Sequence, residues 1–107
     1  MKRNEINTEV IPGVFKLFGQ NWKIRYGNKH EMDDNLGLCQ TDDFEILIQE
    51  GQTQESMTHT LLHELCHSIE QKLHLNLTEA QVDLMALGLL NLLRDNPDLL
   101  KIFKEIK

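Results

Sequence analysis

Three residues in the middle of the chain, His63, Glu64 and His67, have the types and the spacing of a metal-dependent hydrolytic centre. In an α-helix, two histidines four residues apart lie about 6 Å apart along the axis and leave the same face. Both imidazoles could then bind one zinc ion at about 2 Å. Glu64 lies about 100° further round the helix. From there its carboxylate could accept a proton from a metal-bound water.

The stretch that contains these residues, Ser56 to Leu73, has the periodicity of one amphipathic helix. Its apolar residues recur at three- and four-residue spacing: Met57, Leu61, Leu62, Leu65 and Ile69. The pattern H-E-x-x-H on a helix is the zinc-binding motif of metalloproteases. The alternative is a chance match, with two histidines on the solvated face of an ordinary helix. The apolar residues beside the motif and the acidic residues that follow it favour the metal site.

A catalytic zinc usually has three protein ligands and one open position, and helical geometry alone leaves the third ligand undecided. Glu79 and Asp83 lie one turn apart on the next predicted helix, which a short link folds back antiparallel to the first. A count of helical rise slightly favours Asp83, whereas crossed helices would bring the longer Glu79 level. His59 would lie about 12 Å from His67 along the axis. His59 and His74 are therefore predicted to be ordinary surface residues.

The run from Glu79 to Ala86, E-A-Q-V-D-L-M-A, carries a family resemblance. It resembles the E-x-x-A-[DN]-x-F-A signature of ImmA/IrrE-type metallopeptidases of bacteria and mobile elements, with Val82 in place of Ala and Met85 in place of Phe. The order of motifs, from about residue 44 to residue 99, is similar to that of gluzincin zinc peptidases and of small phage-encoded proteins of this kind. The match departs from the family in the short gap between the second motif histidine and Glu79.

This resemblance implies that Glu79 is the third ligand of a zinc ion (Zn²⁺), with His63 and His67. Asp83 would then accept the remaining N–H of a ligand histidine and fix its tautomer. The implied function is that of a zinc-dependent metallopeptidase, which hydrolyses a peptide bond in an intracellular protein with Glu64 as general base. Two alternatives stay open: a non-catalytic zinc-binding module for protein interactions, and an amidase of small substrates.

Length and composition predict one small domain, residues 1–107. The formal charge of −6, without any basic stripe, argues against a nucleic-acid or anionic-membrane partner. The first ten residues lack the apolar region of a secretory signal, and the leucine-rich tract 84–93 is too short to span a bilayer. Two cysteines, Cys39 and Cys66, make no disulfide framework. A cytoplasmic protein is expected, and a homodimer is one hypothesis for covering the leucine-rich helices.

Alternating apolar residues in the first half predict a small antiparallel sheet. Residues 14–26 are predicted to form a hairpin or one bent strand, residues 36–39 a short strand, and residues 44–49 a strand whose edge could pair with an extended substrate. After the motif helix, Thr78 and Gln81 form a predicted capping box for a helix that ends near Arg94. Pro97 then begins a third helix to about Ile106. The predicted fold is therefore α+β, with a sheet followed by a three-helix segment that carries the H-E-x-x-H helix.

Overall fold

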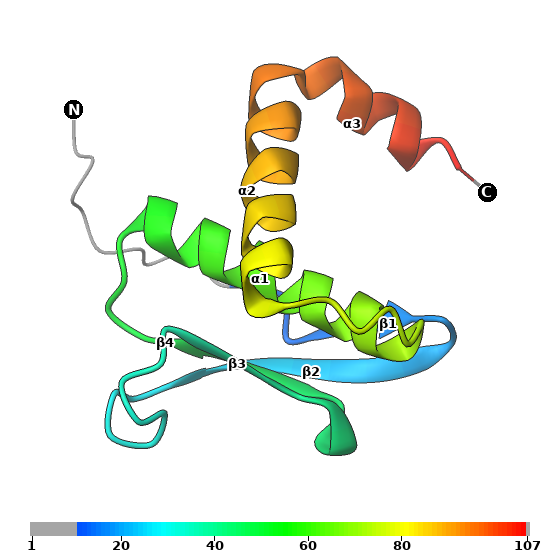
Figure 1. Ribbon diagram of the computed structural model, residues 1–107. Helices are drawn as coiled ribbons and strands as arrows, with labels where there is room; N and C mark the ends of the chain where they lie inside the picture. The colour runs from blue at the N-terminus through cyan, green and yellow to red at the C-terminus, as the bar shows by residue number, and fades with distance from the viewer. Residues whose placement is uncertain (1–10, 107) are drawn as a thin grey trace.

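The computed structural model describes residues 11–106, which form a four-stranded sheet followed by three helices (Figure 1). The strands are β1 (Val14–Leu17), β2 (Gln20–Gly27), β3 (Gly37–Gln40) and β4 (Glu45–Gln49), with a 3-10 turn at Thr41–Asp43 between the last two. The helices are α1 (Gln54–Lys72), α2 (Glu79–Asp95) and α3 (Pro97–Lys104). The predicted α+β fold, with its sheet before its helices, is confirmed. The first ten residues, read from their sequence as no secretory signal, lie outside the described part.

The sheet has the strand order β1-β2-β4-β3 and is mixed rather than wholly antiparallel. β1 and β2 form the predicted hairpin, and β3 pairs with β4 antiparallel. β4, however, runs parallel to β2. The reason is that the chain first places β3 at the outside and then turns back into the gap beside β2. β4 suits this central place because consecutive apolar residues, Ile46, Leu47 and Ile48, are buried on both of its faces.

The central place of β4 corrects one expectation from the sequence. The strand predicted at residues 44–49 was expected to offer an edge to a substrate, but both of its edges are paired within the sheet. β3 pairs with β4 alone and is therefore an edge strand of the sheet. Any pairing with an extended peptide beside α1 would have to use β3.

α1 lies across one face of the sheet and closes the main core (Figure 1). The buried core residues are Ile11, Trp22, Ile24, Ile46, Ile48 and Met57. Trp22 also stacks on Phe15, with ring centroids 5.6 Å apart. Leu61 and Leu65 of α1 pack against this cluster, so the apolar stripe of the motif helix faces the sheet as its periodicity predicts.

Local signals in the sequence set the helix boundaries. The Thr53 side chain accepts a hydrogen bond from the Ser56 backbone N–H, so α1 begins at Gln54, two residues before its predicted start. The predicted capping box is present at the start of α2, where Thr78 and Gln81 each accept a hydrogen bond from the other's backbone N–H. α3 begins at Pro97 as predicted and ends at Lys104, two residues before its predicted end.

α2 crosses α1 and rises away from the sheet, and α3 turns off at its far end (Figure 1). We call α2 and α3 the C-terminal arm, and β1 to β4 with α1 the body. Val82 and Ala86 of α2 are fully buried, whereas many apolar residues of the arm are exposed: Leu84, Met85, Leu87, Leu92, Leu100, Ile102 and Phe103. Within residues 11–106, no helix has the length and apolar character that a membrane span requires.

Candidate metal centre

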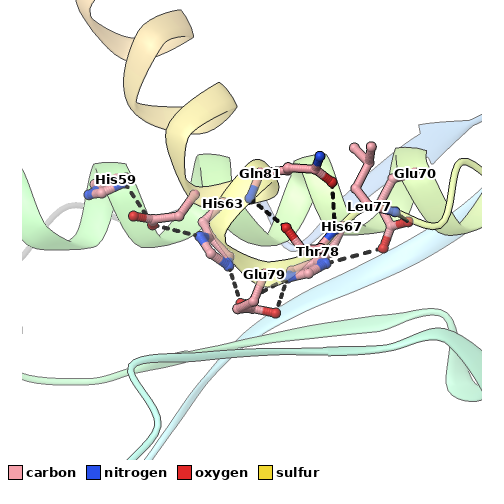
Figure 2. Close-up of polar contacts among 9 residues, drawn as sticks. His59, His63, His67, Glu70, Leu77, Thr78, Glu79 and Gln81 are labelled. Atoms are coloured by element: carbon pink, nitrogen blue, oxygen red, sulfur yellow. Dashed lines mark hydrogen bonds and ion pairs between the residues drawn. The ribbon is translucent and has the colours of Figure 1, made fainter.

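α1 and the first turn of α2 bring together His63, His67 and Glu79 (Figure 2). The Nε2 atoms of His63 and His67 lie 2.7 Å and 3.1 Å from the same carboxylate oxygen of Glu79. One potential ligand atom from each of the three residues lies within 4.8 Å of the other two. Two imidazole nitrogens and one carboxylate therefore converge on one point, and this set of groups could hold a metal ion.

The link between the helices explains why Glu79 reaches both histidines. His74 and Asn76 have left-handed backbone conformations, each with φ of 56°, which turn the chain sharply after α1. The capping box then makes Glu79 the first residue of α2. Because α2 crosses α1 at this end, Glu79 lies between the two rings (Figure 2). The simple rise count, which assumed helices lying alongside each other, therefore misleads.

Asp83 lies one turn further along α2 and contacts the other side of the His63 ring. Its carboxylate is 3.0 Å from His63 Nδ1, and it is also 3.4 Å from His59 Nε2. This is the position that the family resemblance implies for Asp83, a carboxylate that holds a ligand histidine through its remaining nitrogen. Asp83 is outside the group of three converging side chains.

Glu70 plays the corresponding part for His67, and the sequence analysis missed it. The Glu70 side chain is buried, its Oε1 lies 3.4 Å from His67 Nδ1, and its Oε2 accepts a hydrogen bond of 3.3 Å from the Leu77 backbone N–H. It thus ties a motif histidine to the link that leads into α2 (Figure 2). The available signal was its spacing, three residues after His67, which places both side chains on one face of the helix.

Electrostatics within the cluster favour charge on His67 and Glu79. Burial acts to lower the pKa of His67, but hydrogen bonds to Glu79 and Glu70 outweigh it and the net pKa is raised. The hydrogen bond from His67, followed by that from His63, lowers the pKa of the Glu79 carboxyl despite partial desolvation. In the absence of a metal, a protonated His67 therefore stabilises the negative charge of the Glu79 carboxylate.

Glu64 leaves α1 on the side that faces β3 and is only 6% exposed. Burial raises the pKa of its carboxyl, against the opposing attraction of His63 and His67. A carboxylate whose pKa lies above its usual range and which borders a cavity is suited to accept a proton. The structure thus brings the predicted general base beside the three converging side chains.

Two cavities lie on either side of Glu64, and residues of β3 line both of them. One, of about 340 Å³, is lined by the strand's start at Gly37 and by His59, His63 and Asp83. The other, of about 440 Å³, is lined by Gly37 and Cys39 of β3 and by His67 and Glu79. Together they form a cleft between α1 and the edge strand, with the His63, His67 and Glu79 cluster beside it. We call this the β3 cleft.

The remaining candidate residues lie apart from the cluster. His74 is exposed in the link between α1 and α2, as predicted. His59 is partly buried and contacts Asp83 rather than the three converging side chains. Cys39 is half-buried on β3, and burial raises the pKa of its thiol to about 12. Cys66 is half-buried as well, with its pKa raised by burial. Both cysteines are free, as their number predicted.

Comparison with models of protein families, with curated proteins and with solved structures found no match for this chain. The resemblance to ImmA/IrrE-type metallopeptidases therefore rests on the motif residues alone.

Proposed function

We propose that this protein is a zinc-dependent metallopeptidase that hydrolyses a peptide bond in a protein or peptide substrate. The observation that supports the proposal best is the convergence of His63 Nε2, His67 Nε2 and the Glu79 carboxylate, with the buried Glu64 beside them. Two histidines and a glutamate are one of the known ligand sets of catalytic zinc, and they leave a fourth position open.

The distances from Glu79 to the two histidines are close to those of a zinc site, and the three candidate ligand atoms lie within 4.8 Å of one another. Ligand atoms about 2.0–2.1 Å from a tetrahedral zinc are about 3.3 Å from one another. The nitrogen–oxygen distances of 2.7 Å and 3.1 Å are a few tenths of an ångström shorter, as expected where a hydrogen bond takes the place of two metal bonds. Glu79 is 74% exposed in its side chain, so it can withdraw by this amount without disturbing the core.

In the proposed reaction, side chains of this protein transfer a proton and hold the two histidine rings in place. Zinc, when bound, lowers the pKa of a coordinated water and polarises the carbonyl of the scissile bond. Glu64 accepts a proton from the attacking water and passes it to the leaving amine. Asp83 and Glu70 hold the rings of His63 and His67 through their Nδ1 atoms, so that both Nε2 atoms keep their direction.

The β3 cleft is the proposed binding site for the substrate. β3 has one unpaired edge, and an extended peptide could pair with it by backbone hydrogen bonds while it lies against α1. The cleft volumes of about 340 Å³ and 440 Å³ on either side of Glu64 would accommodate a few residues at most. We therefore propose a short extended segment, rather than a folded surface, as the part of the substrate that is recognised.

The test compares wild type with Glu64→Gln, and with Glu55→Gln as a matched control on an exposed part of the same helix. About one zinc per chain is expected in all three by metal analysis. Cleavage of a peptide library, followed by mass spectrometry, is expected for wild type and Glu55→Gln and not for Glu64→Gln. Cleavage that persists in Glu64→Gln would refute the mechanism. Wild-type protein that takes up no zinc at neutral pH would refute the proposal as a whole.

Two other functions have specific support. The exposed apolar residues of the C-terminal arm favour a zinc-binding interaction module, in which Glu64→Gln would leave the cellular effect unchanged. The small cleft favours an amidase of small substrates, which would cleave short acyl-amides and no protein. A homodimer formed through the arm stays a prediction, which light scattering across concentrations can test. A cytoplasmic location and the absence of nucleic-acid or membrane partners also stay predictions.

A further inference from the structure

Gly37 is the first residue of β3 and lies close to α1. Of the described glycines, it is the one where an added Cβ would lie nearest to another side chain. A Cβ atom added at Gly37 would lie 2.6 Å from Thr60 Cγ2, 2.8 Å from Glu64 Oε2 and 2.9 Å from Glu64 Cγ. Carbon atoms that are not bonded pack at about 3.5–4.0 Å. The side chains of Thr60 and Glu64 therefore fill the space that any side chain at position 37 would need.

The backbone of Gly37 does not itself require glycine. Its φ lies outside the left-handed range, which among the described glycines is found at other positions in turns. β3 is also fixed in place at this residue, which pairs with Ile48 of the central strand. The need for glycine thus comes from the close approach of Glu64 and Thr60, as is typical of a glycine in a strand where another element comes near.

The carboxylate of Glu64 is held in a different way from its neighbours. The rings of His63 and His67 each have a carboxylate partner at Nδ1 and another at Nε2. Within residues 11–106, the Glu64 carboxylate has no hydrogen-bond partner. The bare backbone of Gly37 bounds one side of the space in which this carboxylate lies, between α1 and β3.

We propose that Gly37 is the positioning residue for the general base, since its missing side chain leaves the space in which the Glu64 carboxylate lies. This inference rests on the proposed peptidase function. It identifies β3 as part of the catalytic apparatus as well as the edge of the cleft. A methyl group at position 37 costs stability where it meets Thr60, and it moves the Glu64 carboxylate away from the attacking water. Misplacement of a reacting group by about 1 Å can cost on the order of 100-fold in rate.

The experiment uses Gly37→Ala, Thr60→Ser and the double variant, with Gly88→Ala as control. Gly88 is an exposed residue of α2 at which an added Cβ meets nothing within 4 Å. Thr60→Ser removes the Cγ2 atom of the first clash and keeps the hydroxyl that donates to Gln52 Oε1 at 3.0 Å. Of the three atoms nearest to the added methyl group, the double variant therefore leaves only the two of Glu64.

Gly37→Ala is expected to keep about one zinc per chain and to lose on the order of 100-fold in kcat. The three atoms nearest to its methyl group belong to Thr60 and Glu64 and to no proposed metal ligand. Thr60→Ser should restore the thermal stability of the double variant but not its kcat. Recovery of kcat in the double variant would overturn the inference, because the clash with Thr60 would then be the cause. Activity of Gly37→Ala within about twofold of Gly88→Ala would overturn it as well.

A second measurement separates this inference from the proposed function. The shift in urea midpoint caused by Gly37→Ala is measured in two backgrounds that both carry Thr60→Ser, one with Glu64 and one with Glu64→Ala. A smaller shift in the Glu64→Ala background shows that the two residues compete for one space. Equal shifts would overturn the inference even in an active enzyme. Because no hydrolysis is measured, wild-type protein that cleaves nothing would defeat the peptidase proposal and leave this contact to be judged by its own result.

Discussion

The body and the C-terminal arm differ in how they treat their apolar residues. In the body, Ile46 and Ile48 are completely buried beneath α1. In the arm, Leu84 is 66% exposed and Ile102 is 62% exposed, and burial is concentrated at Val82 and Ala86. The body therefore has a hydrophobic core of its own, whereas the arm packs on the body mainly through the first half of α2.

The candidate metal centre lies across this division. His63, Glu64 and His67 belong to the body, and Glu79 and Asp83 belong to the arm. The candidate centre therefore combines residues of the body, which has a buried core, with residues of the arm, whose apolar side chains are largely exposed. A metal bound by both would then fasten the arm to the body, as a ligand that binds only the assembled state stabilises it.

The largest effect is expected from removal of Glu79, the proposed ligand that the arm supplies. Glu79→Ala should lower zinc affinity by more than the 10–100-fold that outer-shell changes usually cost. The far-UV circular dichroism of the metal-free protein should stay the same, because Glu79 is exposed and Thr78 and Gln81 still cap α2. Competition with a chromophoric chelator measures the affinity, and Asp98→Ala, an exposed acid on α3, serves as control. Affinity equal to that of the control would mean that Glu79 is not a ligand.

The second prediction sets a residue of the body's core against one of the arm. Ile46→Ala should lower the free energy of unfolding by about 2–5 kcal/mol, since it leaves a cavity in a packed core. Leu84→Ala should change it by about 0.5 kcal/mol or less, because the side chain is already in water. Urea unfolding of the metal-free protein measures both.

A large, concentration-dependent cost for Leu84→Ala would reverse this contrast. It would show that the arm is covered in solution, and the homodimer suggested by the sequence would then be supported. Light scattering of the same two variants distinguishes this case from a local effect on α2.

The same division explains what the sequence could predict. The helix boundaries at Thr53, Thr78 and Pro97 follow from capping rules that involve neighbours in the chain, and they were predicted within two residues. The histidine pair was predictable because helical spacing alone brings it together.

What the sequence left open depends on contacts between distant elements. The choice between Glu79 and Asp83 depends on how α2 crosses α1, which no local rule determines. The parallel pairing of β2 with β4 depends on which strands become neighbours in the sheet. The need for glycine at position 37 depends on how closely α1 approaches β3. Glu70 is an intermediate case, because its helical spacing from His67 was visible in the sequence but its contact with Leu77 was not.

The third prediction compares the two carboxylates that hold the histidine rings, Glu70 from the body and Asp83 from the arm. Glu70→Gln and Asp83→Asn should each lower zinc affinity by about 10–100-fold. The effect of Glu70→Gln should be the larger, because a buried charge is less screened than the half-exposed Asp83 and because Glu70 also accepts the Leu77 N–H. Asp95→Asn, at the exposed end of α2, is the control. A larger loss for Asp83→Asn would assign the dominant support to the arm.

The smallest effect concerns pH, and it again distinguishes a proposed ligand of the body, His67, from the proposed ligand of the arm, Glu79. The pKa of His67 is raised above its ordinary value of about 6.5, and zinc binds only the unprotonated ring. Affinity should therefore fall as pH is lowered through that raised pKa, up to about tenfold per pH unit, so that the fall begins above pH 6.5. The pKa of Glu79 is lowered, so the arm's carboxylate stays ionised over this range and adds nothing to the slope. Chelator competition at pH 6, 7 and 8 measures the slope for wild type and for Glu70→Gln. Since the hydrogen bond from His67 to Glu70 helps to raise the His67 pKa, its loss should move the fall to lower pH. An affinity that is flat between pH 6 and 8 in both proteins would mean that His67 carries no proton for zinc to displace.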